Sequence, residues 1–160
     1  MNILVTGGEG FIGKKLVNRL IKEGHNVTSL DKTETADIIA DLSNENFFWD
    51  GFIEWDIDYI FHLAAQSGGY YSLKDPYIDG KWNCLGTINV VKLAQKLKVK
   101  KLVYVSSMAV YGNQELVSEE HSKHDPISFY GVSKFTGELY TKLIYEHSNI
   151  PYTIFRLFAT

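Results

Sequence analysis

The chain has 160 residues, 45% of them hydrophobic and 22% charged, with a formal net charge of −3, which is typical of one globular domain with a core of its own. The slight acidity disfavours a nucleic-acid binder, and the lone cysteine, Cys84, excludes an internal disulfide framework and a multi-cysteine zinc site. No apolar run approaches the roughly 20 residues of a membrane span, so we expect a cytoplasmic protein that binds neither membranes nor nucleic acids.

The N-terminal quarter alternates apolar runs with one stretch of helical spacing. The run 3–6 is apolar and partly β-branched, which predicts a strand buried on both faces. Apolar residues at helical spacing follow from Ile12, and Gly24 ends the helix that they predict. Residues 27–30 predict a second strand, and residues 38–40 predict a shorter third.

The rest of the chain continues the same alternation. Asp75-Pro76 predicts the start of a helix that runs to about Lys98, because Asp caps a first turn and Pro fits its first position. Another helix is expected at about 128–147, before the break at Pro151. Further strands are expected at residues 59–63, 102–105 and 152–158.

Strand and helix alternate throughout, without an internal repeat or an interdomain linker. This order predicts a parallel sheet whose right-handed crossovers place helices on both faces. The expected fold is therefore α/β, a doubly wound, Rossmann-like parallel sheet in three αβα layers, formed as one domain by residues 1–160.

Three glycines lie between the first strand and the first helix, with the spacing G-x-x-G-x-x-G. Gly7 permits a tight turn, Gly10 lets the backbone approach a diphosphate, and Gly13 packs helix against strand. Free N–H groups and the helix dipole then face the negative charge. A dinucleotide-binding loop is the favoured interpretation, and a glycine-rich turn without a ligand is the alternative.

An acidic residue stands where the second strand ends. Asp31 follows Gly13 by 18 residues, which is where a carboxylate can accept hydrogen bonds from the adenosine ribose. It would repel a 2′-phosphate, so NAD is favoured over NADP, although the neighbouring Lys32 weakens this preference. The alternative is that Asp31 is a simple turn residue.

Tyrosine and lysine lie four residues apart at three places in the chain. A lysine beside a tyrosine favours the phenolate and makes it a usable base, but spacing alone cannot choose among the pairs. Position favours Tyr130/Lys134, because their helix returns to the sheet edge where Ser106 and Ser107 end the fifth strand. We therefore expect Ser107, Tyr130 and Lys134 to act together; the alternative is an exposed pair on a solvated helix face. The other two pairs are Tyr70/Lys74 and Tyr77/Lys81.

Several ordered segments together carry a family resemblance. They are Val5-Thr6-Gly7-Gly8-Glu9-Gly10-Phe11-Ile12-Gly13, Asp41-Leu42, His62-Leu63-Ala64-Ala65, Asn83 with Gly86-Thr87, Ser106-Ser107-Met108-Ala109-Val110-Tyr111-Gly112 and Tyr130-Gly131-Val132-Ser133-Lys134. With them the chain resembles the extended short-chain dehydrogenase/reductase family, in its NAD-dependent epimerase/dehydratase branch with UDP-glucose 4-epimerase-like members. The resemblance covers essentially the whole chain and corresponds to the family's N-terminal, cofactor-binding portion.

The resemblance implies NAD as the cofactor and nucleotide-diphosphate sugars as substrates. It implies that Ser107 hydrogen-bonds the reacting sugar oxygen, that Tyr130 takes its proton, and that Lys134 holds the nicotinamide ribose and acidifies Tyr130. A hydride would pass from the sugar carbon to the nicotinamide. The cofactor-binding residues that the resemblance implies are Gly7, Gly10, Phe11, Ile12, Gly13, Asp31, Asp41 and Leu42 beside the adenine, Ala64 and Ala65 along the cofactor channel, Ser106, Tyr130 and Lys134.

Two positions separate the reactions within this branch. Similar dehydratases place Asp-Glu directly after the catalytic hydroxyl residue, because elimination of water needs a further acid and base. This chain has Met108-Ala109 there, which cannot transfer protons. Epimerisation through a ketone is therefore favoured, and a dehydratase or reductase is the less favoured alternative.

Members of the family are usually longer than this chain, and their C-terminal half supplies most of the sugar-nucleotide pocket. We therefore expect that domain to be absent here, in a natural truncation, a fragment of a longer product, or a chain that kept nucleotide binding and lost catalysis. A non-catalytic dinucleotide-binding module that acts as a sensor or interaction protein is accordingly the rival function.

The segments 76–98 and 127–147 resemble helices that pair into a four-helix dimer interface in similar proteins. Isologous dimers are the commonest oligomers, so we expect a homodimer. The apolar residues offered for that interface are Ile88, Val91, Leu139 and Leu143.

Other reactive or aromatic residues have structural interpretations. His62 lies in a predicted strand and is interpreted as a packing or loop-anchoring residue, and Cys84 as a small buried hydrophobe. His121 and His124 lack a third zinc ligand, so no metal site is predicted. The connector 43–56, irregular or a short helix, holds aromatic residues interpreted as core or as an interaction patch, namely Phe47, Phe48 and Trp49.

Overall fold

The computed structural model describes residues 1–45, 47, 55–114 and 121–158. Its six strands are β1 (Asn2–Thr6), β2 (Asn26–Asp31), β3 (Ile38–Ile39), β4 (Tyr59–His62), β5 (Lys101–Ser107) and β6 (Tyr152–Leu157). They form one parallel sheet in the order β3-β2-β1-β4-β5-β6. The order reverses direction between β1 and β4, and parallel α/β sheets bind ligands outside the carboxyl ends of the strands at such a point.

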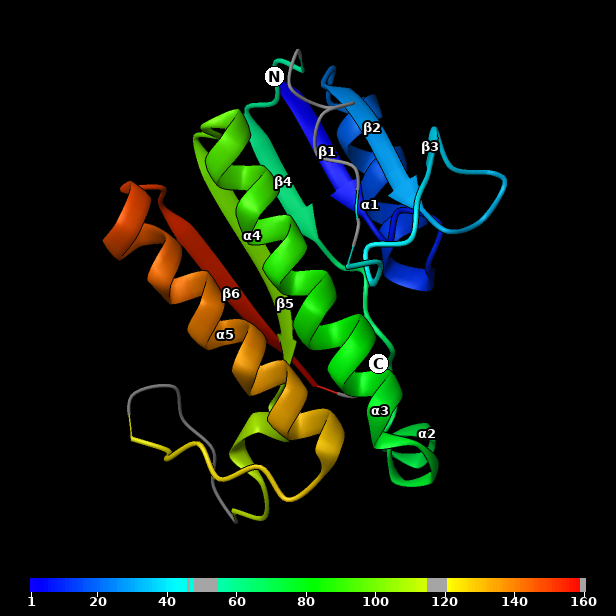
Figure 1. Ribbon diagram of the computed structural model, residues 1–160. Helices are drawn as coiled ribbons and strands as arrows, with labels where there is room; N and C mark the ends of the chain where they lie inside the picture. Colours follow the sequence, from blue (N-terminus) through cyan, green and yellow to red (C-terminus); the bar gives the residue numbers. More distant parts are fainter. Residues whose placement is uncertain (46, 48–54, 115–120, 159–160) are drawn as a thin grey trace.

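Helices cover both faces of this sheet. They are α1 (Phe11–Lys22), α2 (Gly69–Lys74), α3 (Pro76–Ile78), the π-helical η2 (Asp79–Leu85), α4 (Gly86–Leu97), the 3₁₀-helical η3 (Met108–Tyr111) and α5 (Phe129–Ser148). Helix α1 lies on one face, whereas α4 and α5 lie side by side on the other (Figure 1). The predicted Rossmann-like, three-layer fold is confirmed. In the described part of the chain, no helix is long and apolar enough to cross a membrane.

Alternate residues of β1 face opposite layers of the molecule. Ile3 and Val5 pack with Leu20 of α1, while Leu4 belongs to the core under α4 and α5. Because side chains of a strand alternate between its faces, this arrangement buries both sides of β1, as the apolar run predicts. The larger core cluster also contains Leu30, Ile60, Val90, Leu93, Ala94, Leu102 and Ile144.

Short polar side chains fix the helix starts that the sequence predicts. The Asp75 carboxylate accepts the N–H of Tyr77 at 3.1 Å, and the Ser128 hydroxyl accepts the N–H of Gly131 at 3.0 Å. Helix α5 ends at Ser148, and its C-cap Asn149 takes a left-handed backbone conformation with φ of 53°. Ser128 and Asn149 thus cap the two ends of the helix that carries Tyr130 and Lys134.

Some local features differ from the sequence predictions. The single helix expected from residue 76 to residue 98 contains the π-helical stretch η2, and the short helix α2 was not expected. Gly68, with φ of 119°, makes the turn into α2 that other residues rarely adopt. Phe47 is part of the core, whereas Phe48 and Trp49 lie outside the described residues.

Candidate functional site

One cavity of about 750 Å³ runs along the carboxyl ends of the central strands. It is lined by every residue that the sequence proposes for the cofactor and for catalysis, although these residues come from β2, β5, α1, α5 and the loops that follow β1, β3 and β4. They are Gly7, Gly10, Phe11, Ile12, Gly13, Asp31, Asp41, Leu42, Ala64, Ala65, Ser106, Ser107, Tyr130 and Lys134. The fold therefore gathers the predicted residues into a single site.

The glycine loop has no room for a side chain at Gly7 or Gly13. Gly7 has φ of +69°, and a Cβ there would lie 2.6 Å from the backbone nitrogen of Ala64. A Cβ on Gly13 would overlap the Gly7 carbonyl oxygen, so both glycines are needed for close packing. Gly10 caps α1 without a side-chain hydrogen bond. The first N–H groups of α1 are therefore available to an anion such as a diphosphate.

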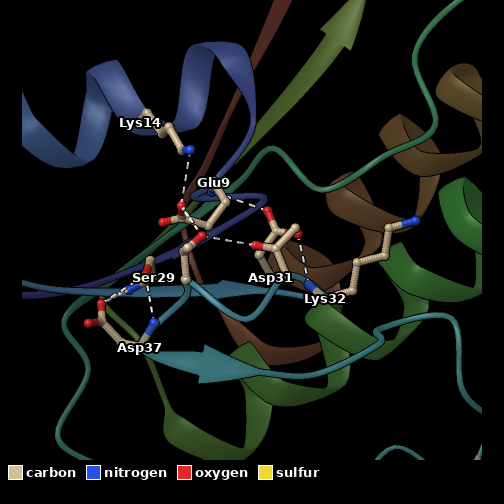
Figure 2. A network of polar contacts seen from close by, with 8 residues as sticks. Glu9, Lys14, Ser29, Asp31, Lys32 and Asp37 are labelled. Carbon is tan, nitrogen blue, oxygen red and sulfur yellow. Dashed lines mark hydrogen bonds and ion pairs between the residues drawn. The ribbon is translucent and has the colours of Figure 1, made fainter.

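Backbone N–H groups hold the Asp31 carboxylate at the end of β2. Its two oxygens accept the N–H of Glu9 at 3.1 Å and the N–H of Lys32 at 2.7 Å. Glu9 is itself fixed by a hydrogen bond from Thr35 at 2.7 Å and an ion pair with Lys14 at 3.3 Å. Figure 2 shows this network, with the Lys32 side chain pointing away from both carboxylates. The position and charge of Asp31 suit an acceptor for ribose hydroxyls.

Asp41 is held in a different way, further along the cavity. Its carboxylate accepts the backbone N–H of Ser43 at 2.8 Å and the Ser43 hydroxyl at 2.6 Å. Burial acts to raise the Asp41 pKa, but these hydrogen bonds and the charges of Lys32 and Lys81 outweigh it and hold the pKa below its usual range. Asp41 is therefore ionised near neutral pH.

The Tyr130 hydroxyl does not have the lowered pKa that its spacing from Lys134 suggests. Burial raises the Tyr130 pKa and the Asp79 carboxylate adds to this effect, while a hydrogen bond from Ser107 only partly offsets it. Lys134 is buried, and burial lowers the pKa of its amine to about 8, against the opposing charge of Glu138. In the chain alone, burial is therefore the largest influence on the pKa of both groups, and the expectation that Lys134 acidifies Tyr130 stays a prediction.

The two rival Tyr/Lys pairs lie elsewhere. In α2, the Lys74 amine lies 4.5 Å from the centre of the Tyr70 ring, and that ring is largely exposed. Tyr77 and Lys81 line a second cavity, which also touches Asp41. These two pairs therefore lie apart from Tyr130/Lys134, which is near the end of β5 as predicted.

Behind the site, a buried carboxylate joins β5, α5 and β6. Glu138 accepts the Ser106 hydroxyl at 2.7 Å and two hydrogen bonds from the Arg156 guanidinium, each at 2.8 Å. Arg156 also donates to the Tyr111 hydroxyl at 2.6 Å. Burial would raise the Glu138 pKa, but the Arg156 and Ser106 contacts keep it below its usual range. This network fixes Ser106, the neighbour of Ser107.

Sequence reasoning did not assign a role to Asn83, although it lies in a segment that carries the resemblance. Its amide accepts the backbone N–H of Gln66 at 2.7 Å and donates to the Ser133 hydroxyl at 2.9 Å. Asn83 thereby ties the loop after β4 to α5. Trp82, the preceding residue, was also missed, and it lines the main cavity. Only the fold shows that η2 faces this cavity.

The residues given structural interpretations lie in packed surroundings. His62 bridges the hydroxyls of Thr6 at 2.7 Å and Thr87 at 3.1 Å, and burial lowers its pKa to about 3. Cys84 is half-buried, and burial raises its thiol pKa. The His124 ring packs between Tyr111 and Phe135. Among residues 1–45, 47, 55–114 and 121–158, no group of three or more His, Cys, Asp or Glu is placed to hold a metal ion.

Comparison with known proteins gives consistent matches over the whole chain. Residues 3–160 match the model of the NAD dependent epimerase/dehydratase family. A putative UDP-glucose 4-epimerase of Methanocaldococcus jannaschii is 37% identical over 96% of this chain and 54% of its own length. The structure of UDP-glucose 4-epimerase from Thermotoga maritima with UDP-glucose has a TM-score of 0.88 and 31% identity, over 98% of this chain and 55% of that one. A Thermus thermophilus UDP-glucose 4-epimerase solved with NAD has a TM-score of 0.88 and 30% identity, over 98% of this chain and 54% of that one. The chain spans about half the length of the curated relatives it matches.

Proposed function

Because the chain belongs to the NAD-dependent epimerase/dehydratase family, we propose that it is the NAD-binding part of a nucleotide-sugar epimerase. The observation that carries this proposal is the single cavity in which Ser107, Tyr130 and Lys134 meet the glycine loop and Asp31. Pure nucleotide binding needs no such triad, whereas hydride chemistry on a sugar hydroxyl needs a proton acceptor at the reacting carbon.

The residues present fit NAD along the whole cavity. The N–H groups that follow Gly10 would hold the diphosphate, because no side-chain cap occupies them. Asp31 accepts the hydroxyls of the adenosine ribose, which favours NAD over NADP because a 2′-phosphate would meet a fixed carboxylate. Tyr130 and Lys134, one helical turn apart, hold the ribose at the nicotinamide end.

The chemistry proceeds by one proton transfer and one hydride transfer in each direction. Bound NAD supplies a hydride acceptor. Ser107 hydrogen-bonds the reacting hydroxyl and Tyr130 takes its proton, so loss of a hydride from the same carbon leaves a ketone. After the keto-sugar rotates, Tyr130 returns the proton while the hydride returns to the other face. The positively charged form of Lys134 would favour the phenolate of Tyr130 once a ligand covers the site.

Epimerisation is preferred to dehydration because of the residues that follow Ser107. Met108 lines the cavity and Ala109 is held in η3, and neither side chain can donate or accept a proton. Elimination of water would need a further acid and base at this place. We therefore assign the branch of the family that returns the hydride without elimination.

Activity of the 160 residues is tested by adding NAD and UDP-, dTDP- or GDP-hexoses to the purified chain and separating the epimers by chromatography. We expect NAD binding and little or no turnover, because hydride transfer needs the reacting carbon within about 3–3.5 Å of the acceptor. The matching relatives are longer, and a nucleotide-sugar substrate is positioned by binding energy remote from its reacting carbon.

Two outcomes would change this proposal. Turnover by the 160 residues that is lost in Tyr130→Phe would show a complete site within this chain. A longer chain that binds NAD but turns over no nucleotide sugar would favour the rival, a non-catalytic dinucleotide-binding module. Activity in a longer chain, again lost in Tyr130→Phe, would support the epimerase.

A further inference from the structure

Two side chains meet across one end of the main cavity. Lys32 follows β2 and Trp82 belongs to η2, and both line the cavity. The Lys32 ammonium nitrogen lies 3.5 Å from the centre of the Trp82 ring, a close cation–π contact. Figure 2 shows the Lys32 side chain extending away from Asp31, although the two residues are neighbours in sequence. The long, flexible side chain of Lys32 thus covers the face of the Trp82 ring inside the cavity.

The position of this pair along the cavity identifies the part of a dinucleotide that it would meet. The glycine loop marks the diphosphate, and Asp31 marks the adenosine ribose. Beyond Asp31, on the side of β2 and β3, the cavity is lined by Lys32, Ala40, Asp41, Leu42, Ser43 and Trp82. The base attached to that ribose therefore lies within reach of the Trp82 ring.

We propose that Trp82 is the stacking platform for the adenine base, and that Lys32 covers its face until the nucleotide binds. This inference rests on the proposed binding of NAD. Base–aromatic stacking is stronger than a solvent-accessible cation–π contact, so adenine displaces the ammonium group from the ring. The displaced Lys32 keeps a partner, because its charge already acts on the Asp41 carboxylate. Displacement of the Lys32 ammonium from the Trp82 ring by the base therefore costs little free energy.

The proposal is tested with ADP-ribose, which contains the adenosine and diphosphate but lacks nicotinamide. In Trp82→Leu we expect ADP-ribose and NAD to bind at least about fivefold more weakly, as loss of one base–aromatic stack predicts. Trp82→Phe keeps an aromatic face and should bind within about threefold of the original chain. Calorimetric titration measures all three proteins, and equal affinity in Trp82→Leu would overturn the proposal.

Tryptophan fluorescence provides a second measurement, which would not change on nucleotide binding if Trp82 had only a structural role. ADP-ribose should quench the emission of the original chain, and this quenching should disappear in Trp82→Phe. Trp55 packs against the core and does not line the cavity, so Trp55→Phe is the matched control that keeps the quenching. Quenching that survives in Trp82→Phe would place the base elsewhere.

The covering role of Lys32 has its own test. Lys32→Met removes the competing ammonium, so ADP-ribose should bind about two- to fivefold more tightly. Weaker binding would make Lys32 a ligand contact and overturn its covering role. If the original chain binds neither NAD nor ADP-ribose, the proposed function itself fails; if it binds both and Trp82→Leu changes nothing, only the present inference fails.

Discussion

The His62 ring is held by two threonines that determine which of its nitrogens carries the proton. Thr87 donates its single hydroxyl hydrogen to the Asn83 carbonyl oxygen at 2.6 Å, so it can only accept from Nε2 of His62. Thr6 then donates to Nδ1. The ring is neutral and bridges β1, β4 and α4, and its burial disfavours a second proton.

Stability should therefore depend on His62 in mildly acidic solution. Its pKa is about 3 in the folded chain and about 6.5 in the unfolded chain, so between these values only the unfolded chain takes up the proton. The free energy of unfolding consequently falls as the pH drops from 6.5 towards 3, by up to about 2 kcal/mol between pH 6.5 and pH 5.

Urea denaturation at pH 7 and pH 5 measures this effect, with His62→Gln as the comparison because an amide keeps both hydrogen-bonding atoms but does not titrate. We expect His62→Gln to lose less stability than the original chain over this pH interval. Parallel losses in the two proteins would contradict the assignment.

Asp31 should determine the preference for NAD over NADP. Asp31→Asn removes the charge that accepts ribose hydroxyls and repels a 2′-phosphate, so NAD should bind about tenfold more weakly while NADP gains relative to NAD. The control is Asp37→Asn, because the Asp37 carboxylate is nearby but accepts the N–H and hydroxyl of Ser29 instead (Figure 2). Calorimetry with both nucleotides would contradict the role of Asp31 if the original chain bound NADP as tightly as NAD.

At the scale of elements, α5 lies unusually close to β5. A Cβ on Gly137 would overlap the hydroxyl end of Tyr104, whose hydroxyl donates to the Lys134 carbonyl oxygen at 3.3 Å. The next residue, Glu138, binds Arg156 of β6 and Ser106 of β5. A small residue and a buried ion pair thus fix the height and rotation of the helix that carries Tyr130.

Gly137→Ala should test this close approach. Alanine is the better helix former by up to about 1 kcal/mol, but the clash with Tyr104 should outweigh that gain and lower the free energy of unfolding by about 1–3 kcal/mol. Gly80→Ala is the matched control, because nothing lies within 4 Å of a Cβ there. Chemical denaturation should show Gly80→Ala unchanged or stabilised; a stabilised Gly137→Ala would contradict the packing argument.

At the scale of the whole molecule, α5 has two unlike sides. Ile144 is buried in the core, whereas Leu139 and Leu143 are 46% and 43% exposed on the outer side. Val91 of α4 packs partly against the core, so α5 offers more of the free apolar surface than α4 does. We propose that this outer side of α5 forms the interface of a homodimer, since an isologous contact would cover the same surface on both copies.

Sedimentation should then show a dimer that the double substitution Leu139→Lys, Leu143→Lys converts to a monomer. An unpaired lysine in an apolar contact is unfavourable, so each change should weaken association by at least about tenfold. NAD binding should persist, because neither leucine lines the cavity. Leu73→Lys, on the exposed surface of α2, is the control that should stay dimeric. A monomer in the original chain at high micromolar concentration would contradict the proposal.

Much of the fold and site follows from local sequence signals. The apolar run of β1, the positive φ of Gly7 and the close approach of Gly13 to the Gly7 carbonyl oxygen are local features that need no distant partner. Alternation of strands and helices then leaves few topologies, and in a parallel sheet the strand ends meet at one edge. For this reason Ser107 and Tyr130 could be brought together from sequence alone.

Tertiary structure decided the properties that depend on partners far away in the chain. Burial sets the pKa values of Tyr130 and Lys134, and the spacing of the two residues carries no information about that burial. The contact of Trp82 with Lys32 joins residues 50 positions apart, so no short-range pattern reports it. Spacing along a helix determines which side chains share a face, whereas the solvent and charges around that face are set only when the other elements pack against it.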